Sequence, residues 1–309
     1  MSVQCSRVCQ ARKTLHRIAR KKVMGLLGLL AWTVLPILIV LLILSLPFLY
    51  DTKGAVYYHT RFAFYILSVS LVAIVCIPLY CLNPLNVKNI LYISYLLKHV
   101  TKVLGITWEL RGGEHLAKDR GCVIAANHQS MLDILGMFNI WGVMNKCAAV
   151  AKKEVFYVWP FGLAAWLGGV VFIDRLNSNK AHDQLNNAAN LMKTHKTKLW
   201  MFPEGTRNSS RTSLLPFKKG AFRVAITCQA PILPVVYSPY YFIDDEKKIF
   251  GQGKMIIQVL PEIPTAGLTL DDLDSLMEKT RNIMSETFQS LVAEVKAIAP
   301  LDSPIHKQC

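Results

Sequence analysis

The sequence has 309 residues, of which 52% are hydrophobic, and its mean hydropathy is +0.32. These values are high for a soluble protein, so a membrane segment is expected. The 35 Lys and Arg against 20 Asp and Glu give a net charge of +15, which favours an anionic lipid surface or a phosphorylated substrate. We expect no nucleic-acid partner, because no motif interleaves aromatic and basic residues.

The first 87 residues are typical of a membrane anchor. A basic segment, residues 1–22, precedes an uncharged stretch at about 23–50 that is long enough to cross a bilayer as a helix. A second uncharged stretch, about 62–87, predicts a second helix, and the short polar connection predicts a hairpin, 23–87. The hairpin either spans the bilayer or is embedded in one leaflet.

The basic residues predict the orientation of this hairpin. Seven Lys and Arg precede the first stretch and three lysines follow the second, whereas the connection has two basic residues opposed by one acidic residue. The positive-inside rule then places both the N-terminus and the chain after residue 87 in the cytosol. The glycosylation sequon at Asn208 is therefore expected to stay unmodified.

The eight cysteines are scattered along the chain, with no pair or cluster at the spacing of a metal site. We therefore expect reduced thiols and no metal. Cys5 and Cys9 lie beside the basic segment, where palmitoylation is a hypothesis.

Residues 88–298 are predicted to form a cytosolic α/β domain, followed by a tail, 299–309. Apolar residues at helical spacing predict an amphipathic helix near the membrane at 91–104. Short apolar runs then alternate with helical stretches, which predicts a sheet covered by helices on both sides. The predicted strands are 106–110, 122–126, 148–151, 170–173, 199–202, 232–237 and 255–260. The predicted helices are 131–141, 181–196, 219–228 and 270–298, the last with Thr269 as its N-cap.

A histidine and an aspartate follow the strand that ends at Ala126. His128 and Asp133 are five residues apart across the turn into the next helix, so the carboxylate can fold back onto the imidazole. It would then fix the tautomer and leave the other ring nitrogen to accept a proton. The alternative is a core histidine beside an aspartate that caps a helix.

A second polar segment, 202–207, follows another predicted strand. Gly205 allows close backbone approach, and the planar guanidinium of Arg207 suits phosphate. Further basic residues at neighbouring strand ends, among them Lys152, Arg175 and Lys218, would complete an anion pocket. The alternative is a solvated turn with a local salt bridge on a basic surface.

Together these segments resemble the glycerolipid acyltransferases. Four blocks stand in the family's order: Asn-His-Gln-Ser-x-x-Asp at 127–133, Phe-Ile-Asp-Arg at 172–175, Phe-Pro-Glu-Gly-Thr-Arg at 202–207 and Pro-Ile-x-Pro-Val at 231–235. The similarity extends over roughly residues 20 to 290 and is greatest to the animal 1-acylglycerol-3-phosphate acyltransferases.

The resemblance implies a fold, an activity and a set of site residues. The fold would be α/β, with a mixed sheet flanked by helices and preceded by the two-helix membrane hairpin. The enzyme would transfer an acyl group from acyl-CoA, without a cofactor or acyl-enzyme, to lysophosphatidic acid at the endoplasmic reticulum membrane. His128 would be the general base and Asp133 its partner, and Pro234 would shape the acyl-donor side. The acceptor's glycerol phosphate would be bound by Arg175, Glu204, Gly205, Thr206 and Arg207, assisted by Lys152 and Lys218.

Two alternatives to this function stay open. The acceptor can instead be glycerol-3-phosphate or another lysophospholipid. A non-catalytic lipid-binding membrane protein on the same fold is a different class of function, but it would not require His128 and Asp133, which are both present.

Overall fold

The computed structural model describes residues 35–36, 38–42, 54–174, 190, 192–208, 210–300 and 303–307. The chain divides into two units, Met1–Thr52 and Lys53–Cys309. In the first unit the described residues are helical, and most of them have exposed apolar side chains. The predicted basic segment with Cys5 and Cys9, and most of the predicted helix 23–50, lie outside the described residues.

The second unit is built on a seven-stranded sheet with the strand order β1-β9-β6-β2-β5-β3-β4. The five strands from β6 to β4 are parallel to one another, β9 is antiparallel to β6, and β1 is parallel to β9. The strands are β1 Ile106–Arg111, β2 Val123–Ala126, β3 Cys147–Lys152, β4 Val171–Ile173, β5 Lys198–Met201, β6 Ile232–Tyr237 and β9 Gly253–Val259. A separate hairpin is formed by β7 Ile243–Asp244 and β8 Ile249–Phe250.

The mixed α/β sheet confirms the predicted fold class, and each predicted strand is found within two residues of its expected bounds. The apolar runs were informative because the central strands β2, β5 and β6 are buried at every position. Strands that are covered on both faces have near-continuous hydrophobic sequences.

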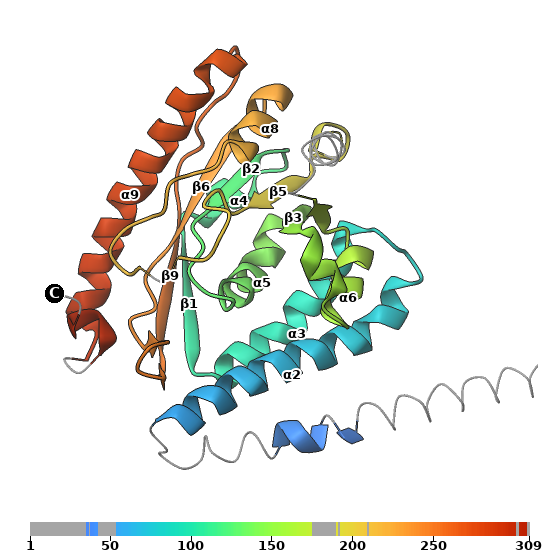
Figure 1. The fold of residues 1–309 in the computed structure, drawn as a ribbon. Coiled ribbons are helices and arrows are strands. Elements are labelled where there is room, and N and C mark those ends of the chain that lie inside the picture. The colour runs from blue at the N-terminus through green and yellow to red at the C-terminus, as the bar shows by residue number, and fades with distance from the viewer. Residues whose placement is uncertain are drawn as a thin grey trace, which may run out of the picture. The chain divides into compact units, whose positions relative to one another are not determined.

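Helices cover the sheet on both faces, with α8 and α9 on one side and α3, α5 and α6 on the other (Figure 1). The α-helices of the domain are α3 Ile90–Val103, α4 Gly113–Ala117, α5 Asp133–Met144, α6 Phe161–Leu167, α8 Gly220–Cys228 and α9 Leu273–Ile298. Short 3₁₀ helices are η2 Val87–Asn89, η3 Lys153–Tyr157, η4 Leu270–Asp272 and η5 Pro304–Lys307. Thr269 caps η4, which continues directly into α9, through a capping box with Asp272. Most of the predicted helix 181–196 lies outside the described residues.

The apolar helix α2, Ala55–Tyr80, occupies the region of the second predicted hairpin helix but begins seven residues earlier. It is long and apolar enough to cross a membrane by length and composition. It also packs against α3 and α6 (Figure 1). Arg61, predicted to lie in the polar connection, is inside α2 and buried, because its guanidinium donates to the backbone carbonyls of Leu104 and Phe250.

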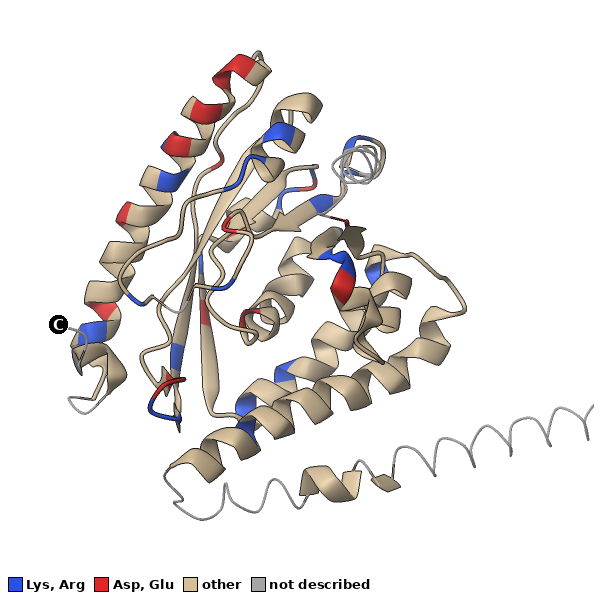
Figure 2. Cartoon of the chain, in the orientation of Figure 1, with Lys and Arg blue, Asp and Glu red and all other residues tan. Residues whose placement is uncertain are grey.

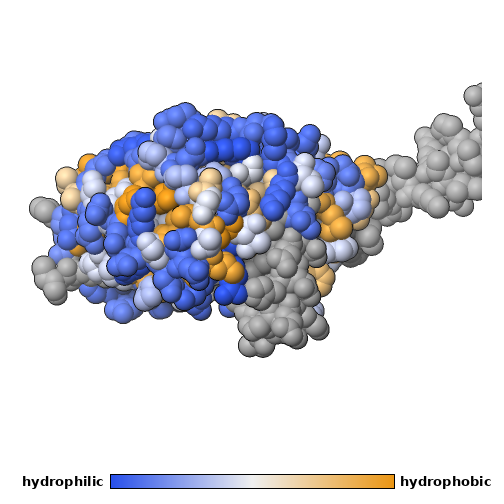
Figure 3. Space-filling model, turned by 90° about the horizontal axis from the view of Figure 1, so that it is seen from above, coloured by the Kyte–Doolittle hydropathy of each residue, from blue (hydrophilic) through white to orange (hydrophobic). Residues whose placement is uncertain are grey.

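Charge is distributed unevenly over the described chain. Acidic side chains are spaced along α9, whereas the charged residues of α2 and α3 are all basic (Figure 2). The surface is not uniformly polar either, since hydrophobic residues are exposed between hydrophilic ones on the face seen in Figure 3.

The parallel strands determine where the polar segments of the predicted site meet. Asn127 follows β2, Phe202 follows β5 and Lys152 ends β3, and these three strands are neighbours with the same direction. The carboxyl ends of neighbouring parallel strands lie at one edge of a sheet, where α/β folds bind their ligands.

Candidate active site

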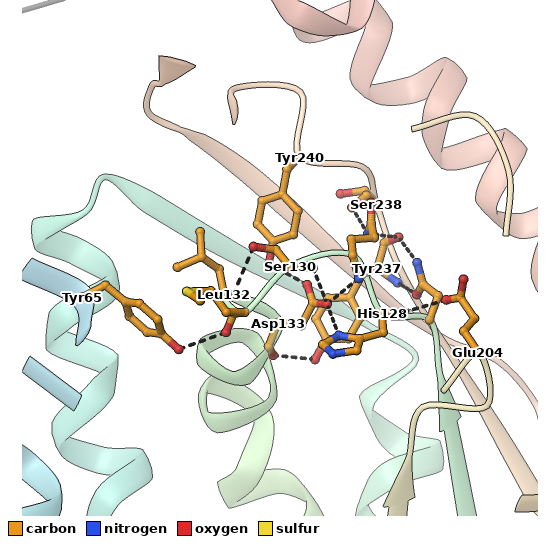
Figure 4. A network of polar contacts seen from close by, with 12 residues as sticks. Tyr65, His128, Ser130, Leu132, Asp133, Glu204, Tyr237, Ser238 and Tyr240 are labelled. Carbon is orange, nitrogen blue, oxygen red and sulfur yellow. Dashed lines mark hydrogen bonds and ion pairs between the residues drawn. The ribbon is translucent and has the colours of Figure 1, made fainter. Parts of the chain in front are cut away.

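The turn from β2 into α5 brings His128 and Asp133 together, as the sequence predicts. Nδ1 of His128 lies 2.8 Å from Oδ2 of Asp133, and the aspartate is completely buried (Figure 4). The same Oδ2 accepts hydrogen bonds from the backbone N–H groups of Gln129, at 2.6 Å, and Ser130, at 2.9 Å. Asp133 therefore both closes the turn that precedes α5 and binds the imidazole.

This contact fixes how His128 can react. Because a carboxylate only accepts hydrogen bonds, Nδ1 carries the proton and Nε2 keeps its lone pair. The imidazole is stacked on Phe202, with 4.1 Å between ring centroids and an angle of 18° between the planes. Its side chain is 19% exposed. The ring is thus held on two sides with a free nitrogen suited to accept a proton.

Three tyrosines surround the turn, and none of them was predicted from the sequence as a site residue. The hydroxyl of Tyr240 donates to Oδ1 of Asp133 at 2.9 Å, that of Tyr237 reaches the backbone carbonyl of Asp133 at 3.4 Å, and that of Tyr65 donates to the carbonyl of Met131 at 2.9 Å (Figure 4). Burial, followed by the nearby Asp133 charge, raises the pKa values of Tyr237 and Tyr240 well above 10. Both phenols therefore stay protonated and able to donate.

Side-chain amides attach the turn to the end of β6. Asn127 accepts a hydrogen bond from the N–H of Tyr237 at 2.7 Å and donates to its carbonyl at 3.2 Å. Gln129 donates to the carbonyl of Ser238 at 2.9 Å. These bonds hold the loop that carries His128 against a buried strand.

Glu204 is predicted to bind the acceptor, but its carboxylate binds backbone amides of the protein. Its Oε1 accepts from the backbone N–H of His128 and its Oε2 from that of Leu215, each at 2.8 Å, and the residue is 2% exposed. Burial raises the pKa of this carboxyl, and the two amide donors act in the opposite direction. The carboxylate holds two backbone segments, because both of its oxygens face amides and not the cavity described below.

The next three residues of this segment lie at the surface of the site. Gly205 has φ = 72°, a left-handed conformation that favours glycine, and an added Cβ would lie 2.8 Å from a side-chain carbon of Lys218. Lys218 therefore packs directly over Gly205. Thr206 and Arg207 are exposed.

One cavity, of about 270 Å³, is lined by half of the predicted site residues. Its polar lining consists of His128, Lys152, Gly205, Thr206 and Arg207. The rest of its wall is apolar and comes chiefly from α3, α5 and α6, with Ile93, Met137, Phe138, Trp141 and Phe161 among the contributors. The cavity thus combines a histidine base, cationic groups and a hydrophobic wall.

Five predicted residues are not among the described residues that line this cavity: Asp133, Glu204 and Lys218, whose contacts are given above, and Arg175 and Pro234. Arg175 lies outside the described residues. Pro234 is buried in β6 beside Ala125 of β2, and it is not among the described residues that line the cavity. Any effect of Pro234 on the acyl-donor side is therefore indirect, through the packing of β6 in the sheet.

The sequon asparagine, Asn208, is buried against the active-site turn. Its N–H donates to the carbonyl of His128 at 2.7 Å, its Nδ2 donates to the carbonyl of Ser213 at 2.7 Å, and its Oδ1 accepts from the N–H of Ser210 at 2.9 Å. Because Asn208 is 6% exposed, a bulky glycan on Nδ2 would have to displace this turn, and the unmodified state stays a prediction.

Comparisons with known proteins point to one family. The Acyltransferase family model matches residues 107–238. Human 1-acyl-sn-glycerol-3-phosphate acyltransferase alpha is 37% identical over 262 residues, which cover 84% of this chain and 92% of the human protein. The human beta enzyme is 39% identical over 204 residues, covering 66% and 72%.

A solved structure shares the fold. The 1-acyl-sn-glycerophosphate (LPA) acyltransferase PlsC from Thermotoga maritima aligns with a TM-score of 0.53 and 23% identity, over 66% of this chain and 81% of that one. The family model covers all four sequence blocks. The chain therefore belongs to the 1-acyl-sn-glycerol-3-phosphate acyltransferase family.

Proposed function

We propose that the protein transfers a fatty acyl group from acyl-CoA to the sn-2 hydroxyl of 1-acyl-sn-glycerol-3-phosphate, giving phosphatidic acid. The observation that carries this proposal is the buried His128–Asp133 pair opening onto a cavity with both cationic and apolar walls. The names of the relatives supply the acceptor, lysophosphatidic acid, and the reaction class.

In the proposed reaction, Nε2 of His128 removes the proton from the acceptor hydroxyl as its oxygen attacks the thioester carbonyl. The carbon–oxygen ester bond forms, the carbon–sulfur bond breaks, and the imidazolium returns the proton to the departing thiolate of CoA. Asp133 stabilises the imidazolium through Nδ1. General base catalysis of this kind contributes about 10²- to 10⁴-fold.

The cationic wall suits the phosphate of the acceptor. Arg207 and Lys152 line the cavity with His128, and Lys218 lies over Gly205 at the same edge. Hydrogen bonds from guanidinium or ammonium groups to phosphate are stronger than those between neutral groups. We extend this group to Arg175, which follows the neighbouring strand β4 in the sequence. Glu204 would support the group indirectly, by holding the backbone on which it is built.

The apolar wall suits a fatty acyl chain. It is formed by buried residues of α5, such as Phe138 and Trp141, and faces Ile93 of α3. Burying methylene groups against such a wall gives about 0.8 kcal/mol each. A thioester whose chain enters here would present its carbonyl near His128.

The same proposal places the protein at the endoplasmic reticulum membrane with its catalytic domain in the cytosol. Supporting observations are the apolar helix α2, as the second helix of the hairpin, and the lysines Lys98 and Lys102 of α3. Exposed Tyr95, Tyr157 and Trp159 are of the types enriched where proteins meet the membrane interface.

The test uses purified membranes that contain the chain. Oleoyl-CoA is supplied with lysophosphatidate, glycerol-3-phosphate and other lysophospholipids in competition, and all acylated products are followed by mass spectrometry. We expect phosphatidate as the main product. A different main product would reassign the acceptor, and the absence of any product would favour a lipid-binding protein.

A further inference from the structure

The catalytic aspartate has two oxygens with different surroundings. Oδ2 is shared by His128 and the two backbone amides of the turn, whereas in the described part of the chain Oδ1 accepts a hydrogen bond only from Tyr240. Tyr240 follows β6 and is 107 residues away in sequence. The environment of Oδ1 thus depends on one side chain that is distant in the sequence (Figure 4).

We propose that Tyr240 is a positioning residue for acyl transfer, whose hydroxyl holds Asp133 in the orientation that meets His128. The inference rests on the proposed function, because it assigns Tyr240 to the machinery of that reaction. Partial rotation about the Cβ–Cγ bond would turn Oδ2 away from His128, and a donor on Oδ1 opposes that rotation.

Tyr240 also separates Asp133 from a second cavity. This cavity, of about 560 Å³, is polar and is lined by Gln129, Ser130 and Tyr240 on the side of the turn, but not by Asp133. Tyr240 is 5% exposed and Asp133 is 0% exposed. The ring therefore excludes solvent from the carboxylate while its hydroxyl supplies the bond that water would otherwise provide.

A purely structural tyrosine stands next to it and gives a matched comparison. Tyr241 is also buried, at 6% exposure, but its hydroxyl accepts from the backbone N–H of Lys254 at 3.0 Å. Replacing either tyrosine by phenylalanine removes one oxygen from a buried ring. Only the change at Tyr240 removes a hydrogen bond from Asp133.

Loss of the Tyr240 hydroxyl has a directional electrostatic effect. Without its donor, Oδ1 carries more of the carboxylate charge, so the Asp133–His128 pair binds a proton more tightly. The other titratable or charged groups that face the pair from the elements packed against it are Tyr65 of α2, Tyr237 of β6, and Glu204 and Arg207 after β5. None of them replaces the bond to Oδ1.

The first experiment compares Tyr240→Phe, Tyr241→Phe and the parent chain in membranes at equal abundance. For Tyr240→Phe we expect kcat to fall about 10- to 100-fold, the range for one hydrogen bond to a charged group, with little change in KM for lysophosphatidate. The acid limb of its pH–activity profile should move to higher pH. Tyr241→Phe should resemble the parent, and equal kinetics and pH profiles for the two variants would overturn the proposal.

A double substitution tests whether Tyr240 acts through Asp133. In an Asp133→Asn background, Tyr240→Phe should cause no further loss of kcat, because the carboxylate that it positions is already absent. A full additional loss in that background would contradict the assignment and indicate a separate role for the tyrosine.

A measurement without turnover separates this inference from the proposed function. Deuterium exchange at the imidazole C2 of His128, followed by mass spectrometry across a pH series, reports protonation even in an inactive protein. We expect the midpoint to move to higher pH in Tyr240→Phe and to stay in place in Tyr241→Phe. The same midpoint in both variants would overturn the positioning role, whether or not the parent makes phosphatidate.

Discussion

Two turns at the carboxyl edge of the sheet differ in whether their polar side chains have hydrogen-bond partners within the protein or are exposed. In the turn after β2, residues 127–133, the imidazole, the carboxylate and the side-chain amides all have partners within the protein. In the turn after β5, residues 202–207, Glu204 points inward to backbone amides, whereas Thr206 and Arg207 are exposed beside the cavity. The proposed acid–base pair is therefore held in place by the fold itself, whereas the proposed anion-binding groups stay exposed.

The difference has a physical reason. A carboxylate in a buried position needs hydrogen-bond donors, so Asp133 and Glu204 order the segments around them. An exposed guanidinium stays hydrated and requires no such order until a phosphate arrives. Preorganised groups stabilise the transition state most, while exposed charges contribute to binding and steering.

The strongest test of the preassembled turn is Asp133→Asn. The oxygen of asparagine can still accept from the two backbone amides and from Nδ1, but a neutral amide no longer stabilises the imidazolium that forms during the reaction. We expect kcat to fall about 10²- to 10⁴-fold, the scale of a lost general base, with a smaller change in KM. Initial rates with lysophosphatidate and oleoyl-CoA measure both, and a near-normal kcat would show that the pair is not assembled for catalysis.

Arg207→Ala tests the open turn. Because the guanidinium is expected to bind the phosphate of lysophosphatidate, KM should rise about tenfold or more, corresponding to one charged hydrogen bond, with a smaller effect on kcat. Lys219→Ala is the matched control, since this exposed cation is paired with Asp274 on α9. A loss confined to kcat, or the same change in KM in both variants, would show that Arg207 does not bind the phosphate.

Glu204→Gln tests whether Glu204 belongs to the ordered half of its turn. The amide nitrogen of glutamine would face a backbone N–H, so one of the two bonds at His128 and Leu215 is lost. We expect a loss of about 1–3 kcal/mol in the free energy of unfolding, the cost of an unsatisfied buried group, with KM for lysophosphatidate unchanged.

Thermal or proteolytic stability of the Glu204→Gln protein supplies the measurement, with Glu286→Gln on the exposed face of α9 as the control. A rise in KM at unchanged stability would instead place the carboxylate on the acceptor, as the family resemblance implies.

The sequence predicts the sheet and the His128–Asp133 contact because both depend on local patterns. Each strand is a short apolar run, and the five-residue spacing within one turn allows one main arrangement of imidazole and carboxylate. The common edge for Lys152 and Arg207 follows from parallel strands alone.

Contacts between distant segments were not predictable in the same way. The aromatic run after β6 gives no sign that Tyr240, rather than Tyr241, reaches Asp133, because the twist of the chain beyond the strand decides it. Arg61 was expected in a polar connection because charge normally marks the end of an apolar helix. It is buried in α2 because two carbonyls of the folded domain accept its hydrogen bonds.

His128→Ala tests whether a preassembled histidine base promotes the acylation of the acceptor. Membranes with equal amounts of parent and variant receive lysophosphatidate and oleoyl-CoA, and phosphatidate is measured by mass spectrometry. We expect product from the parent and a fall of about 10²- to 10⁴-fold in the variant, the contribution of a general base. Equal phosphatidate formation by the two proteins would show that His128 is not the base.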